Sequence, residues 1–146
     1  MGQDMYLTGT LAKSYGSAVD LGTQAGLPIK AVVVELGAWC KHPNLHSYIM
    51  REFHDDERDP REPIWLDQSR IEKIMKAIRE NQLPGTSDKL RGPWNDYYML
   101  NHEQLEDLAI FQKALEWLSL ATPYPSSAER PDDAVVFPSV AYQASW

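Results

Sequence analysis

The sequence is poor in cysteine and in long apolar runs, and both shortages limit what the protein can be. Its 146 residues include one cysteine, Cys40, which excludes an intramolecular disulfide and favours a reducing compartment. No apolar run reaches the roughly 18–20 residues of a membrane helix. The first residues contain Asp4 and lack the apolar segment of a secretory signal. We therefore expect a cytoplasmic protein with no membrane partner.

Sequence motifs that would identify a reaction are also missing. The chain contains no GxGxxG, GxxxxGKS/T, GxSxG or HExxH pattern and no EF-hand loop. Zinc needs three or four convergent ligands, and the single cysteine makes such a set hard to assemble, so we expect no metal and no cofactor. The missing motifs favour a binding protein over an enzyme, although catalytic residues need not be close in sequence.

The charge is acidic and spread along the chain. There are 21 Asp and Glu residues against 14 Lys and Arg residues, which gives a net charge of -7. A non-specific nucleic-acid binder needs clustered Lys and Arg, so nucleic acid is not an expected partner. With 43% hydrophobic and 24% charged residues, the composition is that of one globular domain.

Hydrophobic periodicity predicts an α+β fold. Residues 4–11 alternate, and residues 31–36 are β-branched and apolar, which is typical of strands. Apolar residues three and four apart predict helices at about 43–54, 67–81 and 101–121. We therefore expect a small, mainly antiparallel or mixed sheet packed by about three helices.

The composition changes at residue 122. Residues 1–121 form the expected single α+β domain, and residues 122–133 are rich in proline and serine, as linkers are. Residues 134–146 are apolar again. Three alternatives remain for this C-terminal extension: it adds a strand to the sheet, it packs on the last helix, or it docks on another molecule.

The helix expected at 101–121 has two apolar faces. A surface helix needs only one, and here Ile110 and Trp117 lie on a second stripe. This stripe must be covered by the extension, by another element or by a partner. We therefore take Ile110 and Trp117 as candidate partner-binding residues, together with Phe137, Tyr142 and Trp146 of the extension.

The densest group of reactive side chains comprises residues 39–42 and His46, which follow the strand expected at 31–36. His46 lies there on the apolar stripe of the first helix, where a histidine is either a hydrogen-bonded core residue or a general base whose pKa is tuned by burial. A neighbouring strand is expected to contribute Asp4 and Tyr6. The candidate binding residues are Trp39, Lys41, His46, Asp4 and Tyr6, and the candidate catalytic residues are His46, His42 and Lys41.

Three segments carry a resemblance to a known group of proteins. Residues 1–7 resemble the MGLDMYL start of a group of small, uncharacterised phage and prophage proteins, and residues 35–46 are similar to their central ExGYWRKxxxL/IH segment. Residues 83–87 and 106–111 resemble later segments of that group. The chain departs from the pattern at Ala38 and Cys40, where the group has Tyr and Arg. The resemblance implies a phage-associated gene acting in a bacterial host cell, and it implies no reaction.

Two hypotheses of function follow. In the first, the chain is a non-enzymatic phage-type protein that binds a protein partner and inhibits a host defence system. In the second, it is a small hydrolase or nucleotide-ligand-binding protein with a site around residues 39–46. A structural phage component, which would form a homo-oligomer, is a further alternative.

Overall fold

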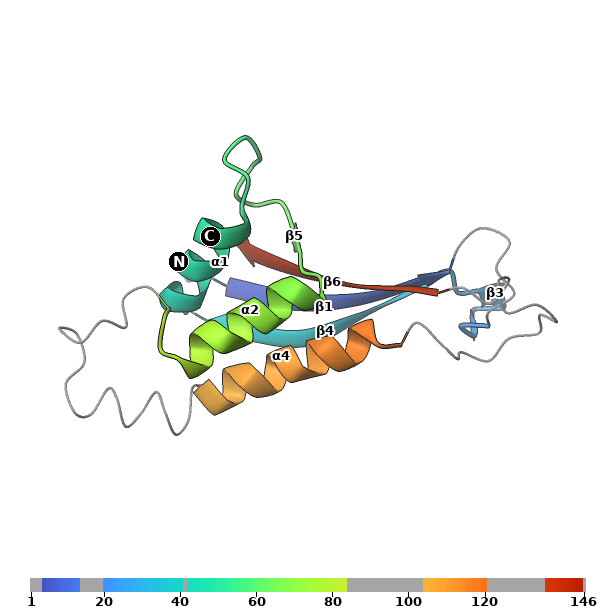
Figure 1. The fold of residues 1–146 in the computed structure, drawn as a ribbon. Coiled ribbons are helices and arrows are strands. Elements are labelled where there is room, and N and C mark those ends of the chain that lie inside the picture. The colour runs from blue at the N-terminus through green and yellow to red at the C-terminus, as the bar shows by residue number, and fades with distance from the viewer. Residues whose placement is uncertain (1–3, 14–19, 41, 84–103, 121–135, 146) are drawn as a thin grey trace.

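The computed structural model describes residues 4–13, 20–40, 42–83, 104–120 and 136–145. The strands in these ranges are β1 (Asp4–Lys13), β2 (Thr23–Gln24), β3 (Leu27–Pro28), β4 (Ala31–Cys40), β5 (Ile64–Trp65) and β6 (Val136–Ser145). The helices in the same ranges are α1 (Pro43–Phe53), α2 (Gln68–Arg79) and α4 (Gln104–Leu118) (Figure 1). A small antiparallel sheet with about three helices is the α+β fold that the sequence predicted.

The main sheet is antiparallel and has the strand order β4-β1-β6-β5. β1 pairs along its length with β4 on one side and with β6 on the other. The pairing of β1 with β4 shifts register between Leu7 and Thr8, so Leu36 of β4 has no residue directly opposite and forms a β-bulge. β2 and β3 form a separate two-residue hairpin, whose turn residues Ala25 and Gly26 have positive φ angles of 53° and 78°.

The C-terminal extension is an interior part of the sheet. β6 lies between β1 and β5, and its register with β1 runs from Asp4 opposite Ser145 to Lys13 opposite Val136. Of the three alternatives for this segment, the structure therefore has the added strand. The domain does not end at residue 121, because its sheet depends on residues 136–145. The linker at 122–133 lies outside the described residues.

The helices begin where the sequence supplies caps. Pro43 opens α1, where its missing N–H costs nothing, and the Asp67 carboxylate caps α2 by accepting from the backbone N–H of Arg70 at 2.8 Å. The ends of the third predicted helix, residues 101–103 and 121, lie outside the described residues. In Figure 1, α1, α2 and α4 all lie on the same side of the sheet.

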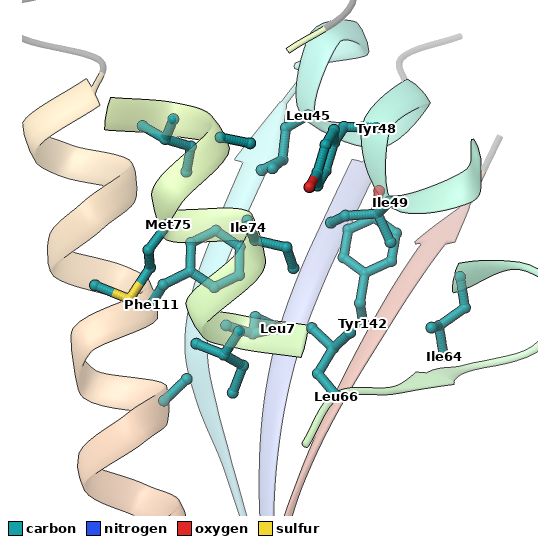
Figure 2. Packing of buried hydrophobic residues seen from close by; sticks show 14 of the residues in the cluster. Leu7, Leu45, Tyr48, Ile49, Ile64, Leu66, Ile74, Met75, Phe111 and Tyr142 are labelled. Atoms are coloured by element: carbon teal, nitrogen blue, oxygen red, sulfur yellow. The ribbon is translucent and has the colours of Figure 1, made fainter. Parts of the chain in front are cut away.

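The hydrophobic core fills the space between these helices and the sheet (Figure 2). Alternate residues of β1, including Met5 and Leu7, point into it and are fully buried. Ile74 of α2, Phe111 of α4 and Tyr142 of β6 meet them from the other elements. The core therefore joins segments from both ends of the chain, and the last strand is needed to complete it.

The second apolar stripe of α4 is covered by the sheet itself. A Cβ atom added at Gly37 of β4 would run into the side chain of Ile110, and one added at Gly9 of β1 would lie 2.9 Å from the Trp117 ring. The Trp117 indole N–H donates to the carbonyl oxygen of Thr10 at 3.1 Å. Two glycines thus let the large side chains of α4 approach the strands closely, and this stripe is partly buried against the sheet.

Candidate functional site

The reactive residues around the end of β4 are joined by one buried carboxylate. Asp107 of α4 accepts from the Trp39 indole N–H at 2.8 Å through Oδ1, and its Oδ2 lies 2.7 Å from Nε2 of His42. Asp107 is 4% exposed, and the Trp39 ring stacks on Phe111 with centroids 5.7 Å apart. A carboxylate buried in this way is stable because both of its oxygens accept hydrogen bonds.

Both ring nitrogens of His42 take part in structural contacts. Nδ1 accepts from the backbone N–H of Leu45 at 3.4 Å and so caps α1. Because Nδ1 accepts, Nε2 carries the proton and donates to Asp107. His42 therefore connects the start of α1 to α4, and this geometry leaves no nitrogen of the neutral ring for general-base catalysis.

His46 is a core residue. It is 8% exposed, and its Nδ1 is hydrogen-bonded to the hydroxyl of Tyr142 at 2.7 Å. Burial lowers the pKa of His46, because the charged imidazolium loses water there, and burial raises the pKa of Tyr142 for the corresponding reason. Of the two interpretations that the sequence allows for His46, this geometry matches the hydrogen-bonded core histidine.

A pocket of about 340 Å³ lies beside His42 and Asp107. Its lining also includes Cys40, Asn44 and Glu106. Lys41, a candidate for catalysis and binding, lies outside the described residues. Within the described ranges, no three His, Cys, Asp or Glu side chains are grouped so that they could hold a metal ion. The pocket could admit a small polar ligand, but the structure offers it no catalytic base from the two histidines.

The candidate binding residues are divided between the two faces of the sheet. β1 and β4 are neighbours, as expected, with Asp4 opposite Cys40 and Tyr6 opposite Ala38. Side chains alternate along a strand, however, and the buried Met5 faces the helices. Asp4 and Tyr6 therefore face away from Trp39 and His46, and the five residues do not form one site.

The candidate partner-binding residues are divided in the same way. Ile110 and Trp117 pack against glycines of the sheet, and Tyr142 is only 1% exposed. Tyr142 therefore belongs to the interior, and Ile110 and Trp117 are partly buried. Phe137 is 56% exposed and points away from the helices, whereas Trp146 lies outside the described residues.

The side of the main sheet that faces away from the helices, which we call the open face, collects the exposed residues. No described helix covers it. It consists of Asp4, Tyr6, Thr8, Thr10 and Ala12 of β1, Ala31, Val33, Glu35, Ala38 and Cys40 of β4, Trp65 of β5, and Phe137, Ser139, Ala141, Gln143 and Ser145 of β6. Small side chains such as those of Ala38, Ala141 and Ser139 lie between the large ones.

The open face carries most of the exposed large hydrophobic side chains in the described part of the chain. Two other such residues, Leu27 and Leu105, lie elsewhere. Four lie on the open face, with exposed fractions of 39% for Tyr6, 65% for Val33, 56% for Trp65 and 56% for Phe137. One side of a single antiparallel sheet often faces water, but it then usually carries polar residues. The open face differs from such a surface in its four exposed large hydrophobic side chains.

The charge of the open face is one-sided. Its ionisable carboxylates are Asp4 and Glu35, and it includes no Lys or Arg. A phosphate backbone would meet two negative charges there and no positive one, so this face is unsuited to nucleic acid. A protein surface that combines apolar and basic side chains would complement it.

Sequence reasoning missed Val33, Trp65 and Asp107. The β-branched run at 31–36 predicts a strand that is covered on both faces or at least central, but β4 lies at an edge of the sheet and no described helix covers its open-face side. Asp107 stood between the two apolar stripes of its helix, and a charge at such a boundary is a signal of a buried hydrogen-bonded carboxylate.

No helix in the described ranges is both long and apolar enough to cross a lipid bilayer. Comparison of the chain with protein-family models, with curated proteins and with solved structures gives no match. The function must therefore be inferred from the geometry of the chain, which has one sheet face with exposed apolar residues and one group of buried hydrogen-bonded polar residues.

Proposed function

We propose that the chain is a non-catalytic binding protein that holds a protein partner on its open face. The observation that carries this proposal is the concentration of exposed Tyr6, Val33, Trp65 and Phe137 on the sheet face that no described helix covers. Exposure of these side chains gives no stability to the isolated domain, whereas their burial against a partner would release water from apolar surface. Aromatic residues of this kind are frequent anchors of interfaces.

The same proposal explains His42, His46 and Asp107 as structural residues, so no catalysed reaction is needed to account for them. His42 and His46 are both held by structural hydrogen bonds, and Asp107 is saturated by Trp39 and His42. These contacts fix α1 and α4 on the sheet. These hydrogen bonds make the domain a rigid scaffold that presents the open face. A preformed surface of this kind suits recognition of a partner.

The partner has an expected chemistry and an expected source. Asp4 and Glu35 favour a protein surface with Lys or Arg near its apolar centre. The resemblance of residues 35–46 to phage and prophage proteins directs the search to proteins of a bacterial host. A component of a host defence system, which this chain would inhibit by covering its surface, is the first class to test.

The test compares matched variants of the tagged protein expressed in a bacterial host. Tyr6→Ser with Phe137→Ser removes two anchors of the open face, and Leu105→Ser removes a 60% exposed side chain of α4. We expect one stoichiometric protein to bind the wild type and the Leu105→Ser control, and to bind the open-face variant roughly tenfold or more weakly. Added salt should weaken the complex, because Asp4 and Glu35 contribute charge.

Two results would contradict the proposal. A partner retained equally by the open-face variant would place the contact elsewhere on the molecule. Copurification of a nucleotide in place of a protein would favour the alternative of a small hydrolase or nucleotide-ligand-binding protein, with the ligand in the pocket beside His42.

A further inference from the structure

β4 forms a long free edge of the main sheet. It has ten residues, Ala31–Cys40, and pairs with β1 on one side only. Its sequence is β-branched over 32–34 and has one charged residue, Glu35. An edge strand of this length and composition is a template on which another extended segment can pair.

The hydrogen bonds of the structure identify which backbone groups of β4 point outwards. The backbone N–H of Lys13 donates to the carbonyl oxygen of Lys30, so these two residues form a hydrogen-bonded pair. Hydrogen-bonded and non-hydrogen-bonded pairs alternate along an antiparallel ladder. Counting from this pair along the register, Ala31, Val33 and Glu35 are the residues whose N–H and C=O groups point away from β1.

The other side of β1 confirms this alternation. Gly9, which is opposite Val34, has its backbone groups directed towards β4, so the residue opposite it in β6 must point away from β1. That residue is Val140, and its carbonyl oxygen accepts from the N–H of Leu66 beyond the edge of β6 at 2.8 Å. The register therefore predicts backbone direction correctly where it can be checked.

The two edges of the sheet differ in how many of their outward backbone groups are covered or hydrogen-bonded. At the β6 side, β5 covers part of the edge, and the Gln143 side chain donates to the carbonyl oxygen of Arg61 in the preceding loop at 3.1 Å. At the β4 side, the outward backbone groups of Ala31, Val33 and Glu35 have no hydrogen-bond partner within the described chain. The bulge at Leu36 interrupts this edge, so the regular stretch available for pairing is 31–35.

We infer that residues 31–35 of β4 bind an extended segment of the protein partner, which adds a strand to the sheet beside the open face. This inference rests on the proposed function and names how the partner is held. Main-chain hydrogen bonds to Ala31, Val33 and Glu35 supply the pairing, and side chains of the added strand alternate between the two sides of the sheet. Basic side chains on the open-face side would lie near Glu35, and apolar ones on the other side would lie near Val32 and Val34.

Charge distinguishes this occupant from a second copy of the chain. Self-pairing would bring together two molecules that each carry a net charge of -7. Two acidic copies repel each other, whereas a basic segment is attracted to the chain. The structure therefore favours a basic, extended peptide of another protein.

The test uses a labelled peptide of alternating lysine and valine, seven residues long, and measures its binding by fluorescence anisotropy. Val33→Pro removes the outward N–H of β4 and places a ring at the edge, while the hydrogen bonds from β4 to β1 remain. Val33→Thr changes the same side chain but keeps the N–H. We expect Val33→Pro to weaken binding roughly tenfold or more, and to weaken it much more than Val33→Thr does.

Further measurements make the outcomes distinct. Leu105→Ser should bind the peptide as the wild type does, because Leu105 is an exposed residue of α4 and belongs to neither the open face nor β4. Equal binding by wild type and Val33→Pro, or no saturable binding by the wild type, would overturn the inference, while the open-face variants would still test the proposed function separately. A wild-type dimer in analytical ultracentrifugation that Val33→Pro converts to a monomer would show that the occupant is a second copy, and would overturn the assignment to a basic peptide.

Discussion

The two faces of β1 differ strongly in how much of their side chains is exposed to solvent. Met5, Leu7 and Leu11 face the helices and are at most 1% exposed, whereas Tyr6, between two of them, is 39% exposed on the open face. The same strand thus supplies both the core and the surface, because its side chains alternate. Apolar residues on the helix side are explained by folding, and those on the open face need another explanation, for which we propose binding of a protein partner.

The faces also differ in how tightly they are filled. On the helix side, Gly9 and Gly37 provide space into which Trp117 and Ile110 fit closely. On the open face, alanine, serine and threonine lie beside large exposed side chains such as Phe137 with nothing described packed against them. Substitutions on the helix side should therefore change stability, and substitutions on the open face should change binding.

The largest expected contrast comes from truncating one phenylalanine on each face. Phe111→Ala empties a fully buried position and should lower the unfolding free energy by about 3–5 kcal/mol. Phe137→Ala truncates a 56% exposed side chain and should change it by less than about 0.5 kcal/mol. Urea denaturation of both variants, with similar m-values, measures the difference. Similar losses for the two variants would show that the open face is covered in the folded protein.

A smaller contrast comes from adding methyl groups on opposite faces of β4. Gly37→Ala places a Cβ against Ile110 and should cost about 1–3 kcal/mol, whereas Ala38→Val adds bulk to the exposed neighbour and should cost little. In an Ile110→Ala background, the cost of Gly37→Ala should fall, because the clash is removed. A double-mutant cycle in urea measures this coupling. An unchanged cost of Gly37→Ala in that background would contradict the close packing of α4 on the sheet.

The smallest expected effect is a pH dependence on the helix side of the sheet. Burial lowers the pKa of His46 below its ordinary value of 6.5, so the unfolded chain takes up a proton at this residue before the folded chain does. The stability contributed by neutral His46 is complete above pH 6.5 and is lost as the pH falls from there towards the lowered pKa. The unfolding free energy of the wild type should therefore decrease between about pH 7 and 5 more steeply than that of His46→Gln. Equal slopes would mean that His46 is not desolvated.

Local patterns predicted the elements well. The stripes of apolar residues placed the helices at about 43–54 and 67–81, and the structure has them at Pro43–Phe53 and Gln68–Arg79. The alternation at 4–11 predicted β1 for the same reason, since side-chain period follows backbone geometry. The β-branched run at 31–36 identified β4 but not its full extent to Cys40.

The candidate site could be predicted less well from the sequence, because it depends on which helices and strands become neighbours in the fold. His42 and Asp107 are 65 positions apart, and His46 and Tyr142 are 96 apart, so no local pattern shows that each pair is hydrogen-bonded. The position of α4 on glycines of β1 and β4 is equally non-local. The structure shows Ile110 and Trp117 packed there and partly buried, which the sequence could not show.

The sequence by itself determined the class of fold, the positions of the first two helices, the acidic charge and the lack of known catalytic motifs. Each of these depends on composition or on short-range patterns. Only the tertiary structure decided that the last strand lies inside the sheet, that β4 is at the edge and that one face is left open. These features follow from strand order, which is set by the packing of distant segments around a common core. The proposals depend on this arrangement, since the same strands with helices on both sides would offer no open face, and a sheet with β4 in its interior would offer no free edge at that strand.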